Sequence, residues 1–317
     1  MAGRTLILFR RSNGTVANPT PSSGMSMQGL VRRVRQQFHP LFYARKSPLG
    51  RFAIHILDRP TWLTVHQVSF KVRGRLLTHG LAFAVIGSQE VNQEALAITC
   101  MEHLHLHSFW DVGANIGYYT WLMKTVAPEA EAVLVEPLPA NVALIRDTIQ
   151  RNAFPSTTLI SAAASDSAGE GVLNADSMAG ATSTLEHAET TFEERHWGVA
   201  STPIRISLIS IDAIRPHHGP VDFMKIDVEG HEQSVLRGAS KTIASDQPVL
   251  FIECGHPSHA CLDSLASAGY ILIDADRLRI ASDEPAGNYF CIPARFSSAV
   301  DTLLHIAREK AKGSLAA

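Results

Sequence analysis

Residues 111–120 read DVGANIGYYT, and an apolar, strand-like run leads into them. Two glycines, Gly113 and Gly117, separate this run from a segment with a helical pattern. In doubly wound α/β domains a tight turn of this kind joins a strand to a helix whose N-terminus faces a nucleotide-like ligand. The stretch therefore predicts an α/β fold with a ligand site at this turn.

The glycine spacing indicates the kind of ligand. Dinucleotide-binding turns read G-x-G-x-x-G, and their closely spaced glycines let the backbone approach a pyrophosphate. Here Asn115 lies between only two glycines, and bulky Tyr118 and Tyr119 follow them. We therefore expect a smaller tail, such as the methionine part of S-adenosylmethionine. A nicotinamide (NAD)-dependent Rossmann oxidoreductase is the alternative, because a glycine turn and a ribose carboxylate would suit it too.

An acidic residue ends the next apolar run. Glu136 follows Ala132–Val135 and precedes Pro137. A carboxylate at this place can accept hydrogen bonds from both hydroxyls of an adenosine ribose. We therefore assign Glu136 to the ribose of the cofactor.

A second acidic turn lies further along the chain, where residues 225–239 read KIDVEGHEQSVLRGA. Together with DVGANIGYYT, the VEP at Val135–Pro137 and the IEC that ends at Cys254, this turn resembles the FkbM family of S-adenosylmethionine-dependent methyltransferases. The resemblance extends over Phe109–Asp274. It implies a Rossmann-like class I methyltransferase fold and methyl transfer to a hydroxyl of a sugar, glycolipid or polyketide-type natural product. A non-catalytic adenosyl-binding regulatory subunit is a further alternative, which the presence of Asp111, Glu136 and Asp227 disfavours.

The alternation of strand and helix patterns predicts a mostly parallel sheet with helices on both faces. The class that the chain resembles implies seven strands, the last one antiparallel. We expect strands at Phe109–Val112, Ala132–Val135, Thr158–Ala162, Asp222–Ile226, Val249–Glu253, Ile271–Asp274 and Asn288–Ile292. We expect helices at Tyr118–Val126, Pro139–Asn152, Glu232–Leu236, Ser258–Ala268 and Ser297–Lys312.

We divide the chain into a disordered tail (1–28), a small N-terminal α+β cap (29–107), the methyltransferase domain (108–296) and a C-terminal helix and tail (297–317). In the cap we interpret the basic segment Leu30–Gln37 as a solvated helix face, with a membrane-surface role as the alternative. Gly74 is expected to turn the chain before Leu76. Between Gly169 and Ile214 the alternation of strand and helix patterns is interrupted. This predicts an insertion that forms a lid or acceptor wall, or else a small surface hairpin.

Composition narrows the classes of function. Of the 317 residues 45% are hydrophobic, as in ordinary globular proteins, and the net charge is −2, which argues against a nucleic-acid partner. The four cysteines show no C-x-x-C spacing, and no apolar run is long enough for a transmembrane segment. We therefore expect a cytoplasmic enzyme with a small-molecule or glycan hydroxyl acceptor.

Three loops supply the expected cofactor contacts. Asp111 would order the first turn or accept from the cofactor ammonium, Asn115 would tolerate unusual backbone angles, and Thr120 would contact the cofactor carboxylate. After the third strand, Ser165–Asp166 would accept from the adenine amino group, as in similar methyltransferases. The full predicted set is Asp111, Gly113, Ala114, Asn115, Gly117, Thr120, Glu136, Pro137, Asn141, Ser165 and Asp166.

The acidic turn after the fourth strand supplies the candidate catalytic residues. A hydroxyl acceptor benefits from a base, since its pKa lies far above neutrality. Asp227 is our first choice to face the reacting methyl, and His231 is the candidate base because an unperturbed imidazole titrates near neutrality. Glu229 would act beside them or charge the N-terminus of the next helix, and Lys225 would pair with a carboxylate or contact the acceptor. Asp227 and Glu253 would end neighbouring strands, yet two carboxylates are too few to assign Mg²⁺.

Overall fold

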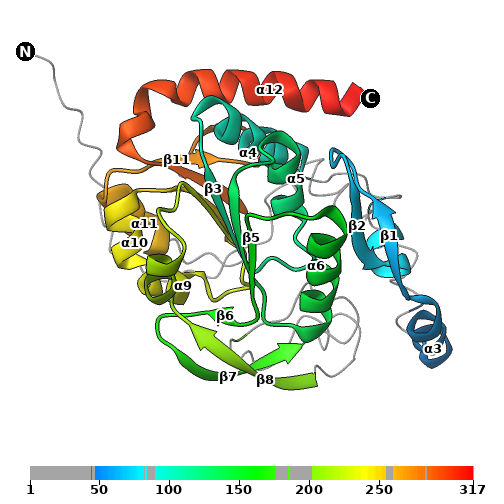
Figure 1. Ribbon diagram of the computed structural model, residues 1–317. Helices are drawn as coiled ribbons and strands as arrows, with labels where there is room; N and C mark the ends of the chain where they lie inside the picture. Colours follow the sequence, from blue (N-terminus) through cyan, green and yellow to red (C-terminus); the bar gives the residue numbers. More distant parts are fainter. Residues whose placement is uncertain are drawn as a thin grey trace, which may run out of the picture.

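An eight-stranded sheet forms the centre of the molecule (Figure 1). The computed structural model describes residues 44, 47–81, 83, 90–175, 185, 202–254, 260–282 and 284–316. The strand order is β12-β11-β13-β10-β9-β3-β4-β5. The strands are β3 (Ser108–Val112), β4 (Glu131–Val135), β5 (Thr157–Ile160), β9 (Phe223–Ile226), β10 (Val249–Glu253), β11 (Ile271–Asp274), β12 (Arg279–Ile280) and β13 (Asn288–Ile292).

The strand directions confirm the predicted sheet. Strands β5, β4, β3, β9 and β10 run parallel, and β13 lies antiparallel between β10 and β11. The two-residue strand β12 adds an eighth member at the edge of β11, which the sequence did not predict. It is too short to leave a pattern of its own.

Both faces of the sheet are covered, so every residue of β3 is buried. Phe109 packs on one face against α4 (Val91–His103), α5 (Tyr118–Val126) and α12 (Val300–Ala316). Trp110 points to the other face, which α9 (Glu232–Gly238) and α11 (Ala260–Ser267) cover. This alternation follows from the two-residue period of a strand. It explains why the central strands read as continuous apolar runs.

The predicted helices appear with small shifts. Both α5 and α6 (Pro139–Asn152) have the predicted bounds, and α6 has proline in its first turn, where the missing N–H is not needed. The closing helix α12 begins at Val300, after the short 3₁₀ helix η4 (Ala294–Ala299). The short helix α10 (Ser240–Asp246) was not predicted.

The N-terminal region divides between two neighbours. The antiparallel ribbon of β1 (Pro60–Thr64) and β2 (Lys71–Arg75) packs on α6, where the Arg73 N–H donates to Thr148 Oγ1 over 2.9 Å. Gly74 was expected to turn the chain, but it pairs with Thr61 inside β2, so that prediction was wrong. Helix α4, assigned to the cap, buries Leu96 and Cys100 completely in the main core.

The irregular insertion contributes two strands, β7 (Gly169–Ala175) and β8 (Thr202–Ile209), to a second sheet of three strands (Figure 1). These two strands pair antiparallel, and β8 also pairs with β6 (Ala163–Ala164). The pairing of β7 with β8 agrees with the hairpin alternative, and Leu173 and Leu185 of the same insertion line the pocket described below, as the wall alternative expects. The predicted tail (1–28), the basic segment 30–37 and residues 176–184 and 186–201 of the insertion lie outside the described residues. Among the helices of the described part, none has the length and apolar character to cross a bilayer.

Candidate functional site

The site lies where the order of the parallel strands reverses. From β3 the chain continues to β4 and β5 on one side and later returns to β9 and β10 on the other. The loops after β3 and β9 therefore leave the same sheet edge side by side, and the Asp227 N–H donates to Val112 O over 3.0 Å. In open α/β sheets ligands bind at such a switch point.

Close packing of these two loops explains the first glycine. Gly113 has φ +79°, and a Cβ atom there would lie 1.8 Å from the carbonyl oxygen of Asp227. Gly117, with φ +81°, leaves room for the indole of Trp121, which would lie 2.8 Å from an added Cβ. Both glycines are thus required by the protein itself. Their predicted contacts with a cofactor stay predictions.

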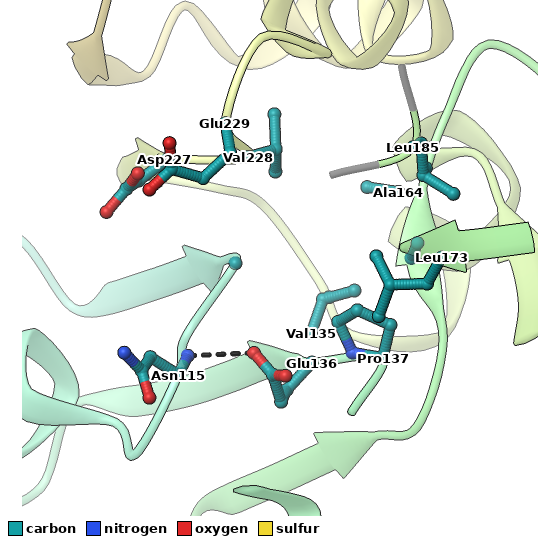
Figure 2. Close-up of a pocket in the computed structure, with 12 residues that line it drawn as sticks. Asn115, Val135, Glu136, Pro137, Ala164, Leu173, Leu185, Asp227, Val228 and Glu229 are labelled. Carbon is teal, nitrogen blue, oxygen red and sulfur yellow. Dashed lines mark hydrogen bonds between the residues drawn. The ribbon is translucent and has the colours of Figure 1, made fainter. Parts of the chain in front are cut away.

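A pocket opens between these loops and the β6-β8-β7 sheet. Its two sides differ in character, because apolar side chains gather on one side and Asn115, Glu136 and Asp227 on the other (Figure 2). Six lining residues belong to the predicted site: Gly113, Asn115, Glu136, Pro137, Asp227 and Glu229. The other six are Val135, Ala163, Ala164, Leu173, Leu185 and Val228, which sequence reasoning missed.

Glu136 holds the loop after β3 in place by hydrogen bonds at the pocket. Its Oε2 accepts from the Asn115 N–H over 2.8 Å (Figure 2), and its Oε1 accepts from the Leu138 N–H over 2.9 Å. Burial raises the pKa of Glu136 to about 7, although these N–H groups favour the charged form. A carboxylate offers about four lone-pair sites, so it retains acceptor capacity for a ligand. Asn141, nearly fully buried, donates to Asn115 Oδ1 over 3.2 Å and supports the same loop.

Asp111 is the second buried carboxylate of the first loop. The Thr120 hydroxyl donates to its Oδ2 over 2.8 Å, whereas Oδ1 is buried without a hydrogen-bond partner in the described part of the chain. Burial raises the pKa of Asp111, against the attraction of Lys225 and the hydrogen bonds of Thr120. Thr120 itself is completely buried, so its predicted contact with a cofactor carboxylate gains no support.

Lys225 lies at the centre of a group of carboxylates. It is the neighbour of Asp111 across β3 and β9, and its Nζ donates to Asp227 Oδ2 over 2.7 Å. The same Nζ lies 5.2 Å from the ring centroid of Tyr119. Burial alone would lower the pKa of Lys225, but attraction to Asp227 and Asp111 outweighs it and the net shift is upward. Lys225 is therefore charged at neutral pH.

Two more carboxyl groups surround this lysine. Repulsion by Asp227, together with burial, raises the pKa of Glu253 to about 9. Burial also raises the pKa of Glu90, which accepts from the Tyr119 hydroxyl over 2.5 Å. We call Glu90, Asp111, Asp227 and Glu253 the carboxyl cluster. Because like charges cannot all ionise in a small volume, Glu253 holds its proton at neutral pH and Asp227 is the better candidate base.

His231 lies with a different set of residues. Its Nε2 is 2.9 Å from Ser165 Oγ, just after β6. The next residue, Asp166, is exposed and pairs with Arg237 over 3.4 Å. Ser165, Asp166 and His231 do not line the pocket; Ala163 and Ala164 line it instead. A catalytic role for His231 and an adenine contact for Asp166 therefore stay predictions without geometric support.

The turn after Asp227 separates two glutamates. Glu229 lines the pocket and has φ +52°, a left-handed conformation that non-glycine residues rarely adopt. Glu232, not Glu229, binds the backbone before α9, because its Oε1 accepts from the Gly230 N–H over 3.0 Å. Glu229 thus lies at the pocket lining in a strained backbone conformation, which is commonly found at functional sites.

The Mg²⁺ hypothesis gains no support. Within the described ranges, no group of three or more His, Cys, Asp or Glu side chains is placed to hold a metal ion. The cation next to the Asp227 carboxylate is the ammonium group of Lys225, whose Nζ lies 2.7 Å from Asp227 Oδ2.

Comparison with known proteins agrees with this geometry. The model of the Methyltransferase FkbM domain matches residues 111–272, about half of the chain. The chain is 26% identical over 187 residues to methyltransferase sdnD of Sordaria araneosa, a match that covers 50% of this chain and 72% of that protein.

Solved structures also resemble the chain. A crystal structure of methyltransferase FkbM from Methylobacillus flagellatus is 18% identical with a TM-score of 0.42, and the match covers 68% of this chain but only 53% of that one. The O-methyltransferase TomG of Streptomyces achromogenes, solved with S-adenosylmethionine, is 10% identical with a TM-score of 0.38, over 67% of this chain and 86% of that one.

The fold is that of a class I methyltransferase, as the sheet order and the matched domain show together. The chain belongs to the FkbM methyltransferase family, and its function is methyl transfer.

Gly113→Ala should destabilise the fold. A Cβ would collide with the backbone of Asp227, and the left-handed φ adds strain, so we expect a loss of about 2 kcal/mol or more in the free energy of unfolding. Gly169→Ala is the matched control, because a Cβ there meets nothing within 4 Å. Urea denaturation measures both. Equal stability of the two variants would contradict the contact between the loops.

Glu253→Gln should change how stability depends on pH. The folded-state pKa of about 9 lies above the unfolded value, so the wild-type carboxyl stabilises the fold at low pH and loses this contribution as pH rises through about 9. Glutamine imitates the protonated form and does not titrate. Melting temperatures of the two proteins should therefore agree at pH values near the unfolded pKa, diverge progressively as pH rises toward 9, with the variant more stable, and keep a constant difference above about pH 9. Parallel curves would show that Glu253 is ionised throughout.

Proposed function

We propose that this chain is an S-adenosylmethionine-dependent O-methyltransferase that acts on a hydroxyl of a small-molecule or glycan acceptor. The charge of the pocket is the observation that carries the proposal. Three acidic residues, Glu136, Asp227 and Glu229, line the pocket, and none of the lining residues that the structure describes is a Lys or Arg. Such a lining attracts a cationic ligand and repels a diphosphate.

The residues present suit the two polar ends of this cofactor. Glu136 offers carboxylate oxygens to a ribose diol at the pocket lining. Asp111 does not line the pocket, but its buried Oδ1, which has no hydrogen-bond partner in the described part of the chain, is an acceptor suited to an ammonium group. The apolar wall of Val135, Pro137 and Leu173 suits an adenine ring. When bound, the cofactor would supply an electrophilic methyl group on a sulfonium, and the chain would orient it and exclude water.

Asp227 is the residue that we propose to receive the acceptor proton. Its side chain is 27% exposed at the pocket, and Lys225 binds its Oδ2, so the orientation of the carboxylate is fixed. Asp227 would accept the proton that the acceptor hydroxyl loses when it is methylated. Glu253, which holds its own proton at neutral pH, could not take it.

The oxidoreductase alternative fits the pocket less well. A nicotinamide dinucleotide carries a negatively charged pyrophosphate, and the glycine turn that would hold it is bordered by Glu136 and Asp227. Calorimetric titration of the purified protein with S-adenosylmethionine, S-adenosylhomocysteine and NADH tests the proposal directly. We expect heat with the first two only, and binding of NADH alone would overturn it.

Glu136→Gln should weaken cofactor binding more than tenfold, because hydrogen bonds from a diol to a charged acceptor are worth about 1.5–3 kcal/mol. The wild-type affinity should also fall as pH drops below about 7, since Glu136 must lose its proton to accept both hydroxyls. The variant should lack this pH dependence. Calorimetry between pH 5.5 and 8, with about one tenfold step expected per unit at low pH, measures both effects. If the wild-type affinity did not change with pH, Glu136 would not be the residue that binds the ribose.

Asp227→Asn should cut turnover about 100-fold or more while largely retaining cofactor affinity, as expected for loss of a general base. Transfer from methyl-labelled cofactor to a panel of sugars, glycolipids and polyketide alcohols gives the rate. His231→Ala is the comparison variant, because the hydrogen bond of His231 to Ser165 places it outside the pocket lining. Loss of turnover in His231→Ala with full activity in Asp227→Asn would exchange their roles.

A further inference from the structure

Helix α3 (Pro48–Leu57) presents an apolar face to solvent. Four of its side chains are exposed: Leu49 (78%), Phe52 (62%), Ile56 (42%) and Leu57 (56%). They recur at the spacing of one helix face, and Leu76, 48% exposed, lies in the adjoining segment η1 (Leu76–Gly80). Single exposed apolar residues are ordinary, but a cluster of this kind marks an interaction surface. We call Leu49, Phe52, Ile56 and Leu57 the α3 face.

The helix is held firmly, so the α3 face is a fixed feature. Ser47 caps its start, where Ser47 Oγ accepts from the Gly50 N–H over 2.9 Å. Ile54, on another side of the helix, is buried. At its end Asp58 accepts from the Leu77 N–H over 2.8 Å and from the Thr78 hydroxyl over 2.6 Å. Figure 1 shows α3 at the margin of the molecule, next to β1 and β2 and away from the central sheet.

The charge of this end of the chain indicates what the α3 face contacts. Residues 1–59 contain ten Lys or Arg residues and a single acidic residue, Asp58, and Asp58 is buried. This part therefore carries a net charge of +9, while residues 60–317 carry −11. An amphipathic apolar helix within a basic segment is the combination that binds the surface of an anionic bilayer.

We propose that the α3 face docks on an anionic lipid surface, with α3 lying in the plane of the interface and the positive charge of this part of the sequence favouring lipid phosphates. A nucleic acid would use the positive charge but not the apolar face. A second copy of this chain would use the apolar face but would bring two strongly positive segments together. A bilayer that contains phosphatidylglycerol satisfies both features. The inference does not depend on the reaction proposed above.

Flotation with vesicles tests the proposal on the full chain. We expect the protein to float with vesicles of phosphatidylcholine and phosphatidylglycerol, at least about tenfold more strongly than with phosphatidylcholine alone, and to be released by salt. The affinity of the double variant Leu49→Ser, Phe52→Ser for these vesicles should be at least about tenfold lower. In the wild type both apolar side chains move from water into the lipid interface on binding, and serine cannot replace this contribution. The melting temperature of the double variant and its affinity for S-adenosylmethionine should stay unchanged, since the two side chains are exposed and lie outside the cofactor pocket.

Ile280→Ser is the matched control, because Ile280 is 48% exposed in β12, outside α3. It should bind vesicles like the wild type. Failure of the wild type to float with anionic vesicles would overturn the proposal, as would flotation of the double variant at the wild-type level. A dimer that the double variant dissociates, without vesicle binding by either protein, would show instead that a second copy covers the α3 face. Failure of cofactor binding in the wild type would count against the proposed function and leave the vesicle result intact.

Discussion

The ammonium of Lys225 is the interaction on which the site depends. It lies buried between Asp111 and Asp227 at the centre of the sheet, where an unpaired charge of either sign would be very costly. Removal of this cation would take away an attraction that lowers the pKa values of Asp111 and Glu253, so both pKa values would rise further. One lysine thus limits how far burial and repulsion raise the pKa values of its neighbours. Glu253 still holds its proton at neutral pH because repulsion by Asp227 and burial outweigh that attraction.

The burial of so many titratable groups has a cost in stability that a core of apolar residues would not have. The pKa values of Glu90, Asp111, Glu136 and Glu253 are all raised, so each of these groups opposes folding when it is ionised. They gather where the loops after β3, β4, β9 and β10 leave the sheet. Perturbed pKa values that cluster at the ligand-binding edge of a sheet are expected of a functional site. The carboxylate oxygens there can still accept hydrogen bonds from a diol or an ammonium group, or can accept the proton of the acceptor. Apolar substitution there would stabilise the fold at the expense of the chemistry.

Sequence patterns predicted the elements that bury continuous apolar runs, such as β10 and α6, because burial and period are local properties of the chain. They also predicted Glu136 and Asp227, since polar residues that end apolar strands must meet at one edge of a parallel sheet. Leu173 and Leu185 were missed as individual lining residues because they lie in the insertion, which has no period to reveal its pairing, although the insertion itself was expected to form a lid or wall. Glu90 joins Lys225 from far along the chain, through the packing of α4 on α5, and no local pattern contains that contact. His231 was placed at the acceptor because it follows Asp227 closely, but the turn at Glu229 directs it to Ser165.

The division of charge along the chain gives the proposed membrane contact an orientation. An anionic surface attracts the N-terminal part, with its net charge of +9, and repels the remainder, with −11. Since both forces fade within about 8–10 Å at physiological salt, they act on whichever parts of the molecule come near the lipid. Docking on the α3 face satisfies both at once, because α3 lies at the margin, away from the central sheet. The acidic pocket would then remain clear of the lipid phosphates, and an acceptor attached to a lipid would need a polar part long enough to extend from the surface to Asp227.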